Sequence, residues 1–130
     1  MTEVAKVIVY NSKKECLLRL RDDDPNIEFP LHWSLIGRVV NESDTPVNAA
    51  RRELLKALGV YVEGPKLFRM QENDGIKQHI FAVKIDSKLS ELNLAEGIRV
   101  KWFTDEDIKR SKIAFNYRDI LHNFLGGNKW

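Results

Sequence analysis

The first ten residues hold the pattern that most constrains the fold of this chain. Residues 3–10 divide between the two sides of an extended strand: Val4, Lys6, Ile8 and Tyr10 on one side, and Ala5, Val7 and Val9 on the other. Both sides are mostly apolar or β-branched, which predicts a strand that other elements cover on both faces. Such a strand belongs inside a sheet that has a layer packed on each side.

The remaining strand and helix signals fit that arrangement. Further strands are predicted over residues 15–21, 32–35, 66–72, 76–86 and 98–103. One longer helix is predicted among them, because Thr45 is a good N-cap, Pro46 suits the first helical position and Gly59 suits a helix end. Shorter helices are predicted over residues 105–110 and 116–125, the last closed by Gly126-Gly127. This order predicts an α/β (α+β) fold, an α/β/α sandwich with a mixed central sheet.

Length and composition predict a single domain over residues 1–130. With 43% hydrophobic and 31% charged residues, the chain can bury a core of its own. A net charge of +2, with Lys and Arg dispersed, does not indicate a nucleic-acid partner. No apolar run is long enough for a membrane span, and residues 1–10 are too polar for a signal peptide, so we expect a cytoplasmic protein without a membrane partner. Cys16 is expected to be a buried, reduced thiol.

Residues 37–60 contain the most informative motif, G-R-V-V-N-E-S-D-T-P-V-N-A-A-R-R-E-L-L-K-A-L-G-V. This stretch resembles, without a gap, the Nudix box. In that family the pattern is G, five residues, E, seven residues, R-E-(apolar), one residue, E-E, one residue, G and an apolar residue. Arg52, Glu53, Leu54, Gly59 and Val60 match it. The flanking segments Leu17–Gly37 and Val100–Ile108 also resemble the family, so the similarity covers most of the chain.

Most of the acids in this motif are replaced. The family's E-E pair falls on Lys56 and Ala57, its opening Gly on Arg38, and its first Glu on Asp44. Residues three and four apart share one helix face, so a magnesium-chelating patch would form from Glu53 with positions 56 and 57. Here two anions are lost and one cation is gained, a change of about three charge units that opposes a divalent ion. The sequence therefore predicts an eroded metal site, with Glu53 as at most a weak ligand.

The resemblance implies structural roles for four residues and leaves three others open. Gly37, Asp44, Arg52 and Gly59 are implied to shape the box, with Asp44 as the partner of Arg52. Glu53 is either a residual catalytic and metal-binding acid or an exposed helix residue paired with Lys56 or Arg52. Arg38 points either into the pocket or to solvent. Lys56 either contacts a phosphate directly or is a solvated helix lysine.

Three further residues are weaker site candidates. Glu72 lies near a predicted turn, and because some family members draw an auxiliary acid from such loops it is a speculative catalytic substitute. His79 is predicted to face the cleft as a base or ligand contact, against the alternative of a satisfied structural histidine. Trp33 could stack on a nucleobase, although core packing is the more common role for such a residue.

These observations predict a nucleotide- or phosphate-binding, or interaction, module with little or no hydrolysis. The resemblance implies an alternative, an active hydrolase of a nucleoside diphosphate linked to another moiety, with Mg²⁺ or Mn²⁺ needed only in that case. A structural subunit with a filled pocket is a third possibility. The expected partner is a small phosphorylated ligand, and a homodimer is consistent with the family. The C-terminal residues 126–130 are either a loose tail or a docking peptide.

Overall fold

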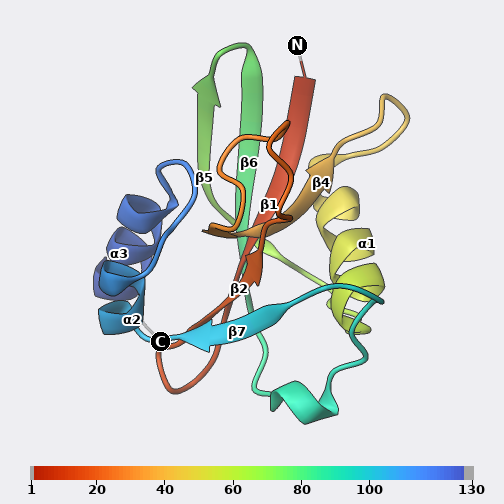
Figure 1. Ribbon diagram of the computed structural model, residues 1–130. Helices are drawn as coiled ribbons and strands as arrows, with labels where there is room; N and C mark the ends of the chain where they lie inside the picture. The colour runs from red at the N-terminus through yellow and green to blue at the C-terminus, as the bar shows by residue number, and fades with distance from the viewer. Residues whose placement is uncertain (1, 128–130) are drawn as a thin grey trace.

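The computed structural model describes residues 2–127 and arranges them in three layers. Helix α1 (Pro46–Leu58) covers one face of a central sheet, and helices α2 (Asp105–Arg110) and α3 (Tyr117–Gly127) cover the other (Figure 1). A short 3₁₀ turn, η1 (Leu89–Glu91), lies in the connection before the last strand. The predicted α/β/α sandwich is therefore confirmed.

The sheet is mixed and is organised around its first strand. The described residues contribute seven strands: β1 (Thr2–Tyr10), β2 (Cys16–Leu20), β3 (Trp33–Ser34), β4 (Ile36–Val39), β5 (Lys66–Asn73), β6 (Ile76–Lys84) and β7 (Val100–Phe103). Strand β1 runs parallel to β6 along one edge. On its other edge, Val4–Val7 pair with β4, whereas Val9 and Tyr10 pair with β2. The sheet therefore divides into two arms beside the middle of β1.

Two cores lie on opposite faces of β1. Ala5, Val7 and Val9 pack in the core beneath α1, and Ile8 packs in the core beneath α2 and α3. This confirms the prediction of a strand covered on both faces. Cys16 is buried in the second core, and desolvation raises the pKa of its thiol to about 12, so it is the reduced structural cysteine that was expected.

Helix α1 has the predicted ends. The Thr45 hydroxyl accepts a hydrogen bond from the Asn48 amide at 3.3 Å, and Pro46 occupies the first turn. At the other end Gly59 takes a φ of 69°, a left-handed conformation suited to glycine, and its amide donates to the Leu55 carbonyl at 2.9 Å. These two caps place Glu53 and Lys56 in the last turns of the helix.

The structure corrects three details of the predicted elements. Strand β4 is a separate strand that the sequence pattern did not predict. It is extended because it pairs with β1, an interaction that its own sequence does not reveal. Strand β7 begins at Val100 rather than at residue 98. Helix α3 continues through Gly127 instead of closing before Gly126. Residues 128–130 lie outside the described part, which leaves the role of the tail a prediction.

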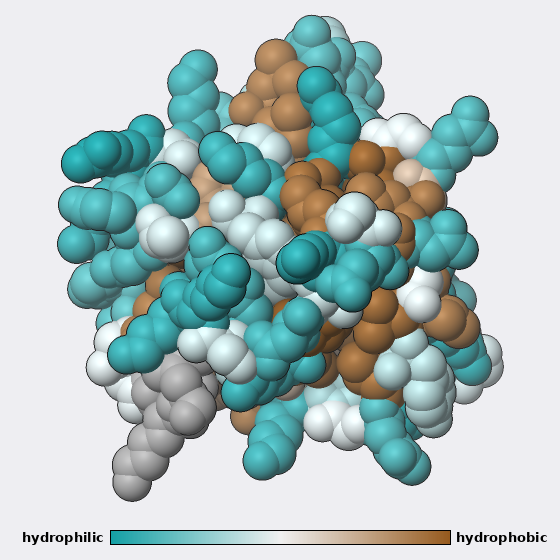
Figure 2. Space-filling view, turned by 90° about the horizontal axis from the view of Figure 1, so that it is seen from below, coloured by the Kyte–Doolittle hydropathy of each residue, from teal (hydrophilic) through white to brown (hydrophobic). Residues whose placement is uncertain are grey.

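The surface is mainly polar at the end of the molecule that carries η1. Figure 2 shows this end, where hydrophilic side chains surround smaller apolar areas. Within the described residues 2–127 no helix combines the length and apolarity required to cross a membrane.

Candidate functional site

A cleft of three adjoining hollows lies where the sheet divides beside β1. The sheet hollow, about 240 Å³, is bordered by Lys6, Arg19, Arg21, Asp22 and Gly37. The helix hollow, about 360 Å³, is bordered by Arg19, Asp22, Glu53, Lys56 and Glu96. The aromatic hollow, about 470 Å³, is bordered by Lys6, Arg21, Gln78, Phe115 and Tyr117. Because neighbouring hollows share residues, one elongated ligand could occupy the whole cleft.

The Glu53 carboxylate is held by two arginines. Its Oε1 accepts a hydrogen bond from Nε of Arg38 at 3.2 Å, and its Oε2 lies 4.0 Å from Nη1 of Arg19. Glu53 is only 7% exposed. A carboxylate that is nearly buried needs such charge partners, since desolvation disfavours an isolated anion. Arg38 therefore turns inward, toward the helix, rather than toward solvent.

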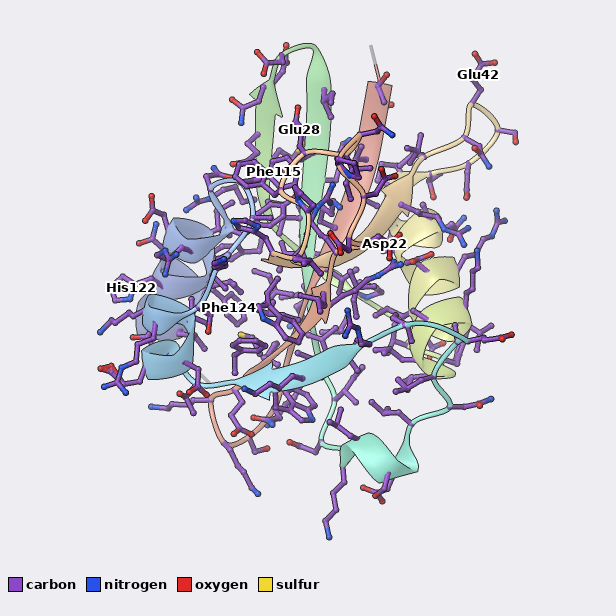
Figure 3. All side chains as sticks on the ribbon, in the orientation of Figure 1. Asp22, Glu28, Glu42, Phe115, His122 and Phe124 are labelled. Carbon is purple, nitrogen blue, oxygen red and sulfur yellow. The ribbon has the colours of Figure 1, made fainter. Side chains whose placement is uncertain are left out.

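The other acids around the helix hollow do not complete a metal site. Asp22 and Glu96 border the hollow together with Glu53. Even so, no three His, Cys, Asp or Glu side chains among residues 2–127 converge closely enough to hold an ion. Glu42 stands at the tip of the loop before α1 and points away from the helix (Figure 3). Mg²⁺ takes several hard oxygen ligands, so one carboxylate already paired with two guanidinium groups does not fit it.

The remaining motif positions have clear places. Arg52 donates from Nη1 to Oδ2 of Asp44 at 2.8 Å and ties α1 to the loop before it, as predicted. Lys56 is exposed and borders the helix hollow beside Ala57, which is 3% exposed. An ammonium therefore faces the volume next to Glu53.

Lys6 approaches the cleft through a space that only glycine leaves open. A Cβ added at Gly37 would lie 2.5 Å from Cδ of Lys6 and would also collide with the Ala5 carbonyl. Gly37 is paired with Lys6 across the β1–β4 ladder, so its missing side chain gives the lysine stem its path. The ammonium of Lys6 makes no hydrogen bond or ion pair with any other residue in the described chain.

Burial and the neighbouring charges make Lys6 a weaker base than an ordinary lysine. Desolvation, followed by the nearby Arg21 and Arg19 guanidinium groups, lowers the pKa of Lys6 to about 8, and Glu53 offsets part of this effect. Three cations thus meet at the sheet hollow against a single acid, Asp22. Binding of an anion would reduce the repulsion among these cations.

The aromatic hollow combines an apolar wall with two polar groups. Nε of Arg21 donates to the Glu28 carbonyl at 2.9 Å, which holds the guanidinium 5.2 Å from the centre of the Phe115 ring. Glu28 and Phe115 lie over the middle of the sheet, as Figure 3 shows. Tyr117 is fully buried, and its hydroxyl has no hydrogen-bond partner among residues 2–127. Burial raises the pKa of this hydroxyl to about 12, and the Gln78 side chain and Arg21 act in the opposite direction.

Comparison with known proteins identifies the family. The family model described as NUDIX domain matches residues 2–124. The chain belongs to the Nudix family. No curated protein matches the sequence.

Solved Nudix structures share the fold at low sequence identity. A mutT/nudix family protein from Listeria innocua has a TM-score of 0.82 and 19% identity, with 96% of this chain and 92% of that chain covered. A MutT protein from Methanosarcina mazei Go1 has a TM-score of 0.73 and 21% identity over 99% and 96% of the two chains. The NUDIX domain of Shewanella oneidensis NrtR, solved with ADP ribose, has a TM-score of 0.73 and 14% identity over 92% and 83%.

Three weaker candidates from the sequence lie away from the cleft formed by the three hollows. Glu72 is exposed on β5 opposite Lys77, with β1 and β6 between its strand and the arm that carries β4. His79 is 8% exposed on the face of β6 opposite to Gln78, and its Nε2 lies 2.7 Å from Oε1 of Glu3. Trp33 packs against Phe103 with ring centres 4.8 Å apart. None of the three borders the hollows described above.

The sequence analysis did not identify several residues that border the cleft. Lys6, Arg19 and Arg21 border the sheet hollow, and Gln78 and Tyr117 border the aromatic hollow. For Lys6 the sequence contained one indication: a charged residue in an otherwise apolar strand is costly to bury, which suggests a specific role. Nothing local in the sequence marks Gln78 or Tyr117, since a distant pairing brings each to the cleft.

Proposed function

We propose that this Nudix-fold protein binds a nucleotide derivative in its cationic cleft without a resident divalent metal, and hydrolyses it slowly or not at all. The observation that carries the proposal is the pairing of Glu53 with Arg38 at 3.2 Å and Arg19 at 4.0 Å. In this arrangement arginine guanidinium groups supply the positive charge that a metal ion would otherwise provide.

The shape of the cleft supports a ligand that has both a ring and a phosphate. The apolar wall of the aromatic hollow suits a planar ring, and Lys6, Arg19 and Arg21 in the adjoining sheet hollow suit an anion. The structure of the Shewanella NUDIX domain with ADP ribose supports a nucleotide derivative as the ligand class. Because the three hollows are open, a purely structural subunit with a filled pocket is the least favoured role.

Metal-independent binding can be tested directly by calorimetry with ADP ribose. The titration is made once with a chelator and once with Mg²⁺, while product release is followed in parallel. We expect equal affinity in both conditions and no turnover. A requirement for Mg²⁺ for binding would contradict the proposal.

The alternative function is a hydrolase with an unusual set of acids. Asp22 and Glu96 border the same hollow as Glu53, and that proximity is the observation in its favour. The variant Glu53→Gln distinguishes the two functions, with Glu42→Gln on the outward-pointing loop as the matched control. If ADP ribose or another nucleotide derivative is turned over, and only Glu53→Gln abolishes this, the hydrolase is the correct assignment.

Three expectations from the sequence remain predictions. The cytoplasmic location and the absence of a nucleic-acid partner rest on the sequence and its composition, and the homodimer rests on the resemblance to the family.

A further inference from the structure

We propose that the preferred ligand carries a single phosphate group, held on the sheet by Lys6 and Arg21 rather than on helix α1, with its ring in the aromatic hollow. This inference rests on the proposed function, because it names the ligand class of the same cleft. A nucleoside monophosphate is the simplest compound with this chemistry.

The distribution of charge along the cleft carries the inference. The sheet hollow sets Lys6, Arg19 and Arg21 against one acid, Asp22. The aromatic hollow has two available cations, Lys6 and Arg21, against one acid, Glu28, because Arg38 at its border is already paired with Glu53. Positive charge is therefore concentrated at the boundary between these two hollows, where Lys6 and Arg21 belong to both.

The helix hollow has the opposite balance. It shares Arg19 and Asp22 with the sheet hollow. Its other charged residues are one cation, Lys56, and two acids, Glu53 and Glu96. The Glu53 carboxylate is itself paired with Arg19 and with Arg38, so it already occupies the nearest guanidinium groups. A second phosphate extending toward α1 would meet two carboxylates for one ammonium, so it would gain little.

The two cations at the boundary are prepared for an anion. The Lys6 ammonium has no hydrogen-bond or ion-pair partner in the described chain. The Arg21 guanidinium is oriented by the Glu28 carbonyl and by the Phe115 ring, so it loses little freedom when it binds. One phosphate at this position would meet both cations at once.

The neighbouring aromatic hollow supports a heterocycle on the same ligand. The Tyr117 hydroxyl is buried at its wall and makes no hydrogen bond of standard geometry, although the Gln78 side chain is close enough to lower its pKa. A buried hydroxyl without an acceptor is costly until it finds one. The Gln78 oxygen accepts from Gln71 at 2.9 Å, so the Gln78 amide group is the part of that side chain that interacts with the Tyr117 oxygen. A ring carbonyl or ring nitrogen would satisfy these donors.

The test compares matched nucleotides by calorimetry in the presence of a chelator. AMP, GMP, CMP and UMP are each paired with the corresponding diphosphate, and ADP ribose is included. We expect the best monophosphate to bind at least as tightly as its diphosphate, although the diphosphate carries more charge. A diphosphate that binds more than about threefold tighter than its monophosphate would overturn the inference.

Two lysine variants locate the phosphate independently. Lys6→Met should weaken monophosphate binding by about ten- to a hundredfold, the usual range for a charge-assisted contact. Lys56→Met removes the same charge from the helix hollow and should change it by less than about threefold, as should Lys13→Met in an exposed turn. An equal loss in Lys56→Met and Lys6→Met would place the phosphate at α1 and refute the inference. Arg21→Gln gives a second measurement if Lys6→Met does not fold.

The outcomes separate this inference from the proposed function. Tight binding of ADP ribose with weak binding of every monophosphate would leave the proposed function standing and remove the inference alone. No binding of any nucleotide would remove both.

Discussion

Raising the pH from 7 to 9 should weaken phosphate binding because Lys6 loses its proton within this range. The pKa of Lys6 is lowered to about 8 by desolvation and by Arg21 and Arg19, with Glu53 acting in the opposite direction. With that pKa, about nine-tenths of the free protein carries a charged Lys6 at pH 7 and about one-tenth at pH 9. If only the charged form binds, apparent affinity should fall about tenfold.

The direction of this effect follows from proton linkage. A bound phosphate favours the ammonium, so the complex holds the Lys6 proton more tightly than the free protein, and affinity falls as pH rises above 8. The phosphate keeps its double charge across the range, because its second pKa is near 6.

Calorimetry with AMP at pH 7, 8 and 9 measures the change, and two variants isolate its source. Lys6→Met should bind weakly with no pH dependence. Lys6→Arg should keep its charge throughout and therefore bind equally well at pH 7 and 9. A wild-type affinity that is constant from pH 7 to 9, or an equal decline in Lys6→Met, would refute the role assigned to Lys6.

Three further predictions address the fold and the metal site. Tyr117→Phe should leave the free energy of unfolding of the ligand-free protein unchanged or raise it by up to about 1 kcal/mol, because the hydroxyl lost makes no hydrogen bond of standard geometry; a loss above about 1 kcal/mol in urea unfolding would show that its interaction with Gln78 is a full hydrogen bond. Gly37→Ala should lower the free energy of unfolding by about 1–3 kcal/mol, because the added Cβ would collide with the Ala5 carbonyl oxygen and the Lys6 stem. Gly64→Ala, whose Cβ would meet nothing within 4 Å, should be tolerated. Equal melting temperatures for the two variants would contradict the close contact at Gly37. The double variant Lys56→Glu with Ala57→Glu should be about 1.4 kcal/mol more stable at a Mg²⁺ concentration ten times its dissociation constant than without Mg²⁺. A melting temperature of this variant that does not change when Mg²⁺ is added would count against the alignment of the motif.

The layers of the fold could be predicted because they depend on local patterns. The two-sided apolar alternation of β1 requires cover on both faces, and Thr45, Pro46 and Gly59 each act through their own backbone conformation or hydrogen bonds. Strand β4 was missed because its extended form depends on pairing with β1, a contact about thirty residues away in the sequence.

The candidate site was predicted less completely than the fold. The resemblance predicts a loss of acids at Lys56 and Ala57, and helical spacing places these positions beside Glu53. The inward turn of Arg38 could not, since it depends on how β4 packs against α1. Glu72 and His79 were expected near the cleft from their strands, yet the order of strands and the face of β6 place them elsewhere.

By itself, the sequence determined which chemical groups the motif offers: Glu53, with Lys56 and Ala57 three and four residues further along. Only the tertiary structure decided where charge collects, because Lys6, Arg21 and Tyr117 come from segments far apart in the chain. Electrostatic interactions depend on distance in space and on burial, neither of which the order of residues specifies. The division of the sheet beside β1 is what brings these groups to one cleft.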